Sequence, residues 1–78
     1  MNYLEVYKNA FMEAFGVDES AVANLNYQDV EEWDSVGHMQ MIAMLEEAFD
    51  IMMEIDDIID FSSFEKGKEI LAKYGVNV

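Results

Sequence analysis

Three stretches of the chain repeat apolar residues every three or four positions, and this spacing restricts the fold more than any other feature. It covers residues 3–15, 35–49 and 62–74 and is typical of amphipathic helices. The apolar run at residues 51–60 predicts a further short helix near residues 56–60. We therefore predict an all-α fold: a small four-helix bundle of three main helices and one short helix.

Residues at the ends of these segments support the helix boundaries. Asn2 opens a capping-box pattern before the first helix, and Gly16 provides its stop. Ser62 and Glu65 form a second capping box before the last helix, which we expect Gly75 to end. Both patterns supply hydrogen-bond partners to backbone groups that a helix end leaves free.

A long first loop connects the first two main helices. It covers residues 17–34, and loops of this length inside a small domain usually serve function or contain short turns of their own. We expect a short helix to start at one of residues 18–20. Apolar residues that can pin the loop to the core are Val22, Leu25, Tyr27 and Val30. Residues 1–78 are expected to form a single domain.

Charge restricts the partners of this chain. Seventeen acidic residues and four lysines give a net charge of −13. Between Lys8 and Lys66 there is no lysine or arginine. Nucleic acids and anionic membranes carry the same sign, so we expect neither as a partner. Partners with basic surfaces are favoured, although an acidic surface that serves only solubility remains an alternative.

Cysteine content and hydropathy indicate the compartment. The chain has no cysteine, which excludes disulfides, thiolate metal sites and a cysteine nucleophile. No segment reaches the roughly 18 apolar residues of a membrane span. The N-terminus lacks the basic start and cleavage site of a signal peptide. We therefore expect a soluble, cytoplasmic protein.

The helix predicted at residues 35–49 has two different sides when it is drawn as a wheel of about 100° per residue. The side expected to face the core comprises His38, Met41, Ile42, Leu45, Ala48 and Phe49. The opposite side carries Val36, Met39, Gln40, Ala43, Glu46 and Glu47. Exposed apolar residues among carboxylates form a reasonable contact surface.

Residue types and their spacing bear on two kinds of chemistry, catalysis and metal binding. Asp34, Ser35 and His38 resemble a catalytic triad only in composition, because the wheel turns His38 towards the core and no glycine-rich turn supplies an oxyanion hole. The carboxylates of residues 56–60 lack the spacing of a calcium loop. We therefore expect neither an enzyme nor a metal site.

Ser35 is the strongest candidate site residue. Either Asp34 or Ser35 suits the N-cap of the second main helix. The first turn of a helix also presents free N–H groups and the positive end of the dipole, so a phosphate ester on Ser35 would be well placed. Capping and attachment are compatible if Asp34 caps the helix and Ser35 carries a group.

The run WDSVGHMQMIAMLEEAFDI, residues 33–51, resembles the Asp-Ser-Leu region of acyl carrier proteins. Ser35 stands at the serine to which that family attaches a 4′-phosphopantetheine arm, with Asp34 before it and Val36 in place of the usual leucine. The run LEEAFDI resembles the end of the family's second helix. A proline common shortly afterwards is absent, and Glu54 stands near its place.

The resemblance implies a monomeric acyl carrier with no catalytic activity of its own. A phosphopantetheinyl transferase would load Ser35 from coenzyme A, and the arm's thiol would hold an acyl group as a thioester. Acyl-loading and acyl-processing enzymes of fatty-acid, polyketide or specialised biosynthesis would then dock through basic surfaces. The residues implied in this docking are Asp34, Val36, Met39, Gln40, Glu46 and Glu47.

Two alternatives remain open at this point. The first is an aminoacyl or peptidyl carrier that uses the same arm, and the second is an unmodified acidic adaptor or inhibitor of a basic partner. The interior is also expected to be rich in methionine, namely Met12, Met41, Met44, Met52 and Met53. These residues are either ordinary core filling or a core soft enough to admit part of an acyl chain.

Overall fold

Every regular element in the computed structural model, which describes residues 2–78, is a helix. In chain order these are α1 (Tyr3–Phe15), α2 (Glu19–Val22), α3 (Ser35–Phe49), α4 (Ile55–Asp60) and α5 (Phe64–Ala72). The all-α class is thus confirmed. The helix beyond the four of the predicted bundle is α2, which is the short helix expected in the first loop. None of the described helices combines the length and the apolar character that crossing a membrane requires.

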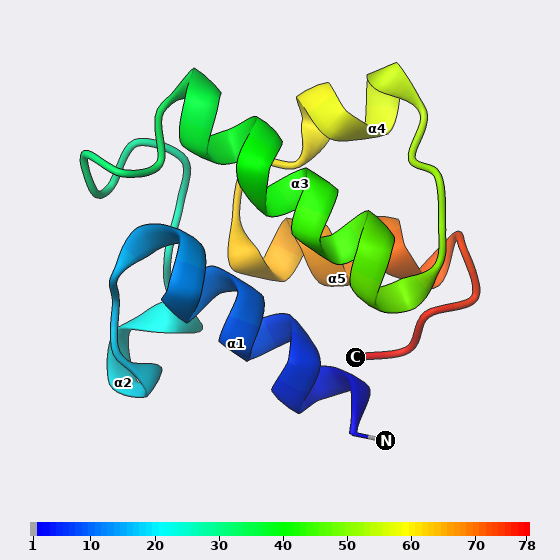
Figure 1. Ribbon diagram of the computed structural model, residues 1–78, viewed down its shortest axis with the longest axis horizontal. Coiled ribbons are helices and arrows are strands. Elements are labelled where there is room, and N and C mark those ends of the chain that lie inside the picture. Colours follow the sequence, from blue (N-terminus) through cyan, green and yellow to red (C-terminus); the bar gives the residue numbers. More distant parts are fainter. Residues whose placement is uncertain (1) are drawn as a thin grey trace.

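Figure 1 shows how the helices are arranged. Helices α1 and α3 contact each other and run in roughly opposite directions, while α5 passes behind α3 in this view. Helix α4 lies beside the first half of α3. Residues between α2 and α3 reach α5 as well, because Leu25 O accepts from Phe64 N at 2.9 Å and Tyr27 N donates to Ser62 O at 2.8 Å.

Local capping explains where the helices begin and end. Asn2 Oδ1 accepts from Glu5 N at 3.2 Å, and Gly16 ends α1 in the left-handed region at φ 66°, as expected. The prediction for the last helix was wrong by one residue at its start, and the helix ends at Ala72, with Lys73 as C-cap, before the Gly75 that was expected to end it. Ser63 is the N-cap, with its Oγ accepting from Lys66 N at 2.9 Å. Ser62 is outside the helix because its carbonyl pairs with the first loop.

Aromatic side chains from four parts of the chain form the centre of the core. Phe11 contacts five rings, those of Tyr7, Phe15, Trp33, Phe61 and Phe64, with centroids 5.0–6.1 Å away. Trp33, at the end of the first loop, is fully buried. Edge-to-face and stacked rings at these separations stabilise a core beyond the area that they bury.

Gly67 lets α5 approach this aromatic centre. A Cβ atom built on Gly67 would lie 2.1 Å from Tyr7 Oη and 2.2 Å from Phe61 Cζ. The Tyr7 hydroxyl itself donates to Phe64 O at 2.7 Å. Burial, with a smaller contribution from Glu65, raises the pKa of Tyr7, so this hydroxyl remains a donor at ordinary pH.

Three residues predicted to lie in the core are exposed. Ala48 is at the edge of the buried side of α3, and the ring of Tyr3 covers its neighbour Phe49 instead, at 5.5 Å between centroids. Tyr27 is 38% exposed because the first loop pairs with the chain before α5 and leaves its ring at the surface. Met52 is 86% exposed and lies in the extended segment before α4.

A polar cluster ties α4 to the end of α5. The Asp57 carboxylate is buried, and it accepts from Lys73 Nζ and from Tyr74 Oη, both at 2.5 Å. Tyr74 Oη in turn accepts from Glu54 N at 2.9 Å. The hydrogen bonds from Lys73 and Tyr74 hold the pKa of Asp57 below its usual value.

Candidate functional site

Asp34 caps α3 and leaves the Ser35 hydroxyl free. Asp34 has the extended backbone of an N-cap, and its Oδ1 accepts from Gly37 N at 2.8 Å. Ser35 is the first residue of the helix and is exposed. Within residues 2–78, its hydroxyl takes part in no hydrogen bond. Asp34 therefore caps the helix, and the Ser35 hydroxyl is left free for attachment of a group.

The first turn of α3 also presents unpaired backbone donors. Within the described chain, the N–H groups of Ser35 and Val36 have no hydrogen-bond partner. They stand at the positive end of a 15-residue helix, where a negative group on the neighbouring hydroxyl would be stabilised.

Gly37 fixes the path by which the chain enters this turn. A Cβ atom on Gly37 would lie 1.9 Å from the carbonyl oxygen of Glu32, so the preceding loop packs directly on the helix backbone. Glycine is the residue that permits so close an approach. This contact holds Ser35 at the molecular surface, at the point where the loop meets the helix.

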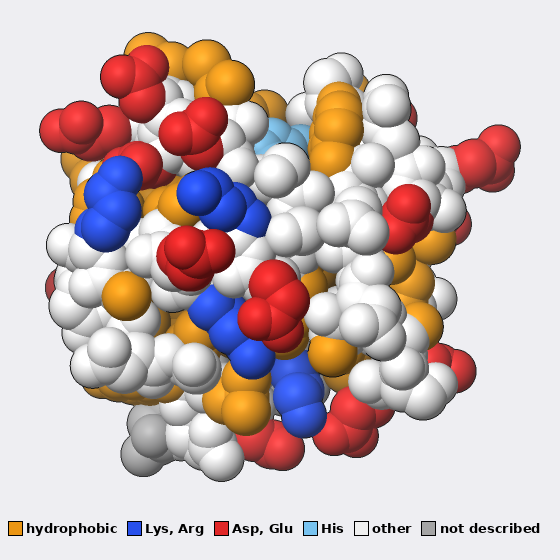
Figure 2. Space-filling view, turned by 180° about the vertical axis from the view of Figure 1, so that it is seen from behind, with side chains coloured by type: hydrophobic (Ala, Val, Ile, Leu, Met, Phe, Trp, Pro, Cys, Tyr) orange, Lys and Arg blue, Asp and Glu red, His pale blue; other side chains and the backbone are white. Residues whose placement is uncertain are grey.

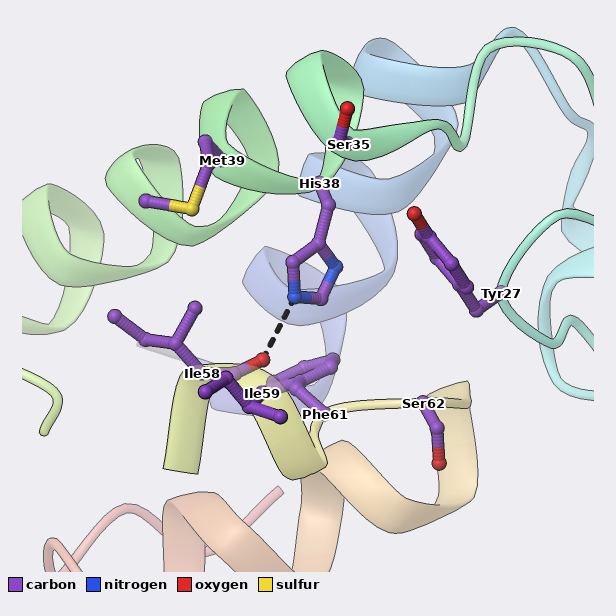
Figure 3. Close-up of a pocket in the computed structure, with 8 residues that line it drawn as sticks. All are labelled: Tyr27, Ser35, His38, Met39, Ile58, Ile59, Phe61 and Ser62. Atoms are coloured by element: carbon purple, nitrogen blue, oxygen red, sulfur yellow. Dashed lines mark hydrogen bonds between the residues drawn. The ribbon is translucent and has the colours of Figure 1, made fainter. Parts of the chain in front are cut away.

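His38 is occupied on both ring nitrogens. Its Nδ1 accepts from Trp33 Nε1 at 2.9 Å, and its Nε2 is 2.8 Å from Ile58 O. Because a carbonyl only accepts, Nε2 is the protonated nitrogen of a neutral ring. The Ser35 hydroxyl points away from this ring in Figure 3, so the geometry gives no Ser-His pair for catalysis.

An apolar pocket of about 300 Å³ lies between α3 and α4, with Ser35 at its rim (Figure 3). The residues that line it are Tyr27, Ser35, His38, Met39, Ile58, Ile59, Phe61 and Ser62. The spacing of residues in the sequence does not indicate Tyr27, Ile58, Ile59, Phe61 or Ser62 as site residues. The paired isoleucines of the short helix at residues 55–60 are the one signal in the sequence for part of this lining.

The residues that the resemblance implies in partner docking differ in how far they are exposed. Val36 and Met39 are 64% and 52% exposed, and Gln40 and Glu47 are also exposed. Glu46 is half-buried, and its Oε2 accepts from Met53 N at 2.8 Å. Its carboxylate therefore helps to join the end of α3 to the segment before α4, which the helix wheel did not indicate.

Charges are distributed unevenly over the surface. Figure 2, seen from behind, shows the lysine side chains on the face that includes α5. All four belong to α1, to α5 or to the residue after it. Acidic residues alone carry the charge along residues 9–65. The start of α3 and the pocket rim therefore belong to a part of the chain without lysine or arginine.

The acidic cluster of α4 does not form a cation site. Among residues 2–78, no three side chains of the metal-binding types are grouped so that they could hold an ion. Asp57 turns inward to Lys73 and Tyr74, whereas Asp56 and Asp60 remain exposed.

Comparisons with known proteins do not identify a family for this chain. No protein-family model matches the chain, and neither does any curated protein or solved structure. The geometry around Ser35 and the resemblance of residues 33–51 are the observations that bear on function.

Proposed function

We propose that the protein is an acyl carrier whose Ser35 hydroxyl bears a 4′-phosphopantetheine arm. The observation that carries this proposal is the position of Ser35. Its hydroxyl is exposed and unpaired, at the first position of α3, and it stands on the rim of an apolar pocket. A helix cap alone does not account for this residue, because Asp34 already performs that role.

The loading reaction fits the groups present at this position. Transfer from coenzyme A breaks the pyrophosphate bond, joins Ser35 Oγ to the phosphorus that carries pantetheine, and releases adenosine 3′,5′-bisphosphate and the hydroxyl proton. The resulting phosphodiester would lie beside the free N–H groups of Ser35 and Val36. When bound, the arm supplies the thiol that holds an acyl group as a thioester, in a chain without cysteine.

The pocket favours an acyl cargo over an aminoacyl cargo. Its lining is mostly apolar and includes no carboxylate. An acyl chain entering from Ser35 would meet Met39, Ile59 and Phe61, whereas the ammonium group of an aminoacyl cargo would find no opposite charge there. Burial of acyl carbons in such a pocket is favourable in proportion to the apolar area removed from water.

Partner enzymes would approach the same region. Asp34, Gln40 and Glu47 offer polar and negative groups around Val36 and Met39, and Glu46 contributes less because it binds Met53 N. Contacts of this kind are fast and salt-sensitive. We propose that the protein acts as a cytoplasmic monomer that presents its cargo to such enzymes.

Intact-mass measurement tests the proposal directly. The folded protein is incubated with coenzyme A and a phosphopantetheinyl transferase of broad specificity, and a mass gain of one phosphopantetheinyl group is expected. Ser35→Ala should gain nothing. Ser62→Ala, at another exposed serine on the pocket, should gain the group as the wild type does. Absence of any gain in the folded wild type with several transferases would overturn the proposal in favour of an unmodified acidic adaptor.

A further inference from the structure

Aromatic rings form one wall of the pocket between α3 and α4. The centroid of the His38 ring is 5.6 Å from that of Tyr27 and 6.1 Å from that of Phe61, with interplanar angles of 73° and 71°. These three residues are here called the ring wall. In Figure 3 they lie to the right of the aliphatic side chains of Met39 and Ile58. The pocket therefore has an aromatic side and an aliphatic side.

The ring wall suits an aromatic ligand better than an alkyl chain. Its neighbouring rings are almost perpendicular, so edges and faces alternate along it. Aromatic rings attract one another in this edge-to-face arrangement beyond the area that they bury. A planar ring in the pocket would continue the series, whereas an alkyl chain has no charge distribution to match it. Met39 adds to this preference, because a thioether sulfur makes favourable contacts with aromatic rings.

The inner end of the pocket is closed by fixed side chains. Both ring nitrogens of His38 are hydrogen-bonded, one to Trp33 and the other to Ile58 O. Phe61 is 1% exposed and stacks on Phe11, with their centroids 6.1 Å apart. Interiors are densely packed, so a long linear chain could pass further inward only by breaking these contacts.

The core behind the pocket is aromatic rather than rich in methionine. Among the methionines expected inside, Met41 and Met53 are buried, whereas Met12 and Met44 are half-buried and Met52 is exposed. Methionine is the side chain that adapts most easily to irregular space. This core is therefore less able to open around a long acyl chain than its composition suggested.

The pocket has room for one aromatic ring near the attachment site. Its volume is about 300 Å³, and an apolar cavity of about 150 Å³ in another protein holds benzene. Met39 and Ile59, which are 52% and 71% exposed, mark its open side. A pantetheine arm on Ser35, at the rim, has enough rotatable bonds to fold back and place its cargo in the pocket.

We infer that the cargo carried on Ser35 is an aromatic acyl group, in which a ring is joined to the thioester carbonyl directly or through a short linker. The inference rests on the proposed function and specifies its substrate class. The ring wall determines this specificity. Tyr27, at 38% exposed, is the member of the wall that can be changed with least effect on the core.

Three cargoes with equal numbers of carbon atoms test the inference: phenylacetyl, cyclohexylacetyl and octanoyl. A broad-specificity transferase joins each acyl-phosphopantetheinyl group to Ser35 from its coenzyme A thioester, and intact mass verifies the product. The rate of thioester cleavage by hydroxylamine is then divided by the rate for the same free coenzyme A thioester, so that intrinsic reactivity cancels. Cargo bound in the pocket is protected. We expect about three- to tenfold more protection of phenylacetyl than of either saturated cargo.

Variants at two tyrosines assign the preference to the ring wall. Tyr27→Leu removes one ring but keeps an apolar side chain, and the preference for phenylacetyl over cyclohexylacetyl should fall about threefold or more. Tyr27→Phe restores a ring and should recover most of the preference. Tyr3→Leu, at a tyrosine of α1 that is similarly exposed (43%) and does not line the pocket, should retain it. Thermal unfolding confirms that each variant is folded.

The outcomes separate this inference from the carrier proposal. If Ser35 is loaded but octanoyl is protected as well as phenylacetyl, or no cargo is protected, the aromatic cargo is overturned and the carrier proposal stands. A phenylacetyl preference that Tyr27→Leu retains in full excludes the ring wall as its cause and also overturns the inference. Failure of the folded wild type to accept a group from coenzyme A or from any of these thioesters overturns both.

Discussion

The indole of Trp33 donates a hydrogen bond of 2.9 Å to His38 Nδ1, and the two rings are nearly parallel, at 14°. The other nitrogen of the same imidazole is 2.8 Å from Ile58 O. His38 therefore joins the end of the first loop to α4 across the pocket. A single side chain thus links the residues before the candidate attachment site to the opposite pocket wall.

Removal of this link should destabilise the fold. In His38→Ala the indole N–H of Trp33, which is fully buried, loses its acceptor. A buried donor without a partner costs about 1–3 kcal/mol, and we expect a loss of free energy of unfolding in that range by urea denaturation. His38→Gln, which keeps one donor and one acceptor, should lose less. Equal stability of His38→Ala and the wild type would show that the link contributes nothing.

The division of roles between Asp34 and Ser35 predicts unequal effects of alanine at the two positions. Asp34→Ala removes the cap on Gly37 N and should cost about 1 kcal/mol of unfolding free energy. Ser35→Ala removes an exposed hydroxyl without a partner and should change stability by less than about 0.5 kcal/mol. Urea denaturation of both variants checks this, and a larger loss in Ser35→Ala would contradict the assigned roles.

Gly67→Ala should be among the most harmful single-methyl additions. The new Cβ would overlap Tyr7 Oη and Phe61 Cζ at 2.1 and 2.2 Å, so α5 must move away from the aromatic core. Overpacking of this kind costs about 1–3 kcal/mol. Differential scanning calorimetry should show a clear fall in Tm, whereas Gln40→Ala on the exposed side of α3 should leave Tm almost unchanged.

The Asp57 cluster predicts a dependence of stability on pH. The hydrogen bonds from Lys73 and Tyr74 lower the folded pKa of Asp57 below its ordinary value of 3.8. A lowered carboxyl pKa stabilises the fold above the unfolded pKa, and this contribution is lost as the pH falls through the folded pKa. Asp57→Asn should therefore be less stable than the wild type near neutral pH and should lose less additional stability on acidification.

Urea midpoints measured from about pH 3 to about pH 7 check this prediction. Asp56→Asn, at the neighbouring exposed carboxylate, serves as the control and should retain the acid dependence of the wild type. Parallel curves for Asp57→Asn and the wild type would show that the cluster is not what links stability to pH.

The helices of this fold were predictable because each long one combines a periodic apolar face with a local cap. Met41, Ile42 and Leu45 were expected inside and are buried. The cap of α5 was not predictable in this way, because Ser62 and Ser63 are adjacent and either suits an N-cap. The choice depends on the pairing of Ser62 O with Tyr27 N, a long-range contact that local spacing does not reveal.

The candidate site was predictable only in part, for a similar reason. The exposed position of Ser35 follows from the helix start and its neighbours in sequence. The pocket requires Tyr27, Ile58 and Phe61 from separate elements, and no spacing rule brings them together. The outward isoleucines of α4 were missed because Asp57 has its cation and hydroxyl partners beyond α5, at Lys73 and Tyr74.

The contact between Trp33 and His38 also gives the protein an optical reporter of its own. The chain has a single tryptophan, so its fluorescence comes from one indole with one defined environment. That indole stacks on Phe15 at 4.8 Å and binds an imidazole that lines the pocket. Entry of a cargo that displaced His38 would change the emission of Trp33, and occupancy of the pocket could be followed without any attached label.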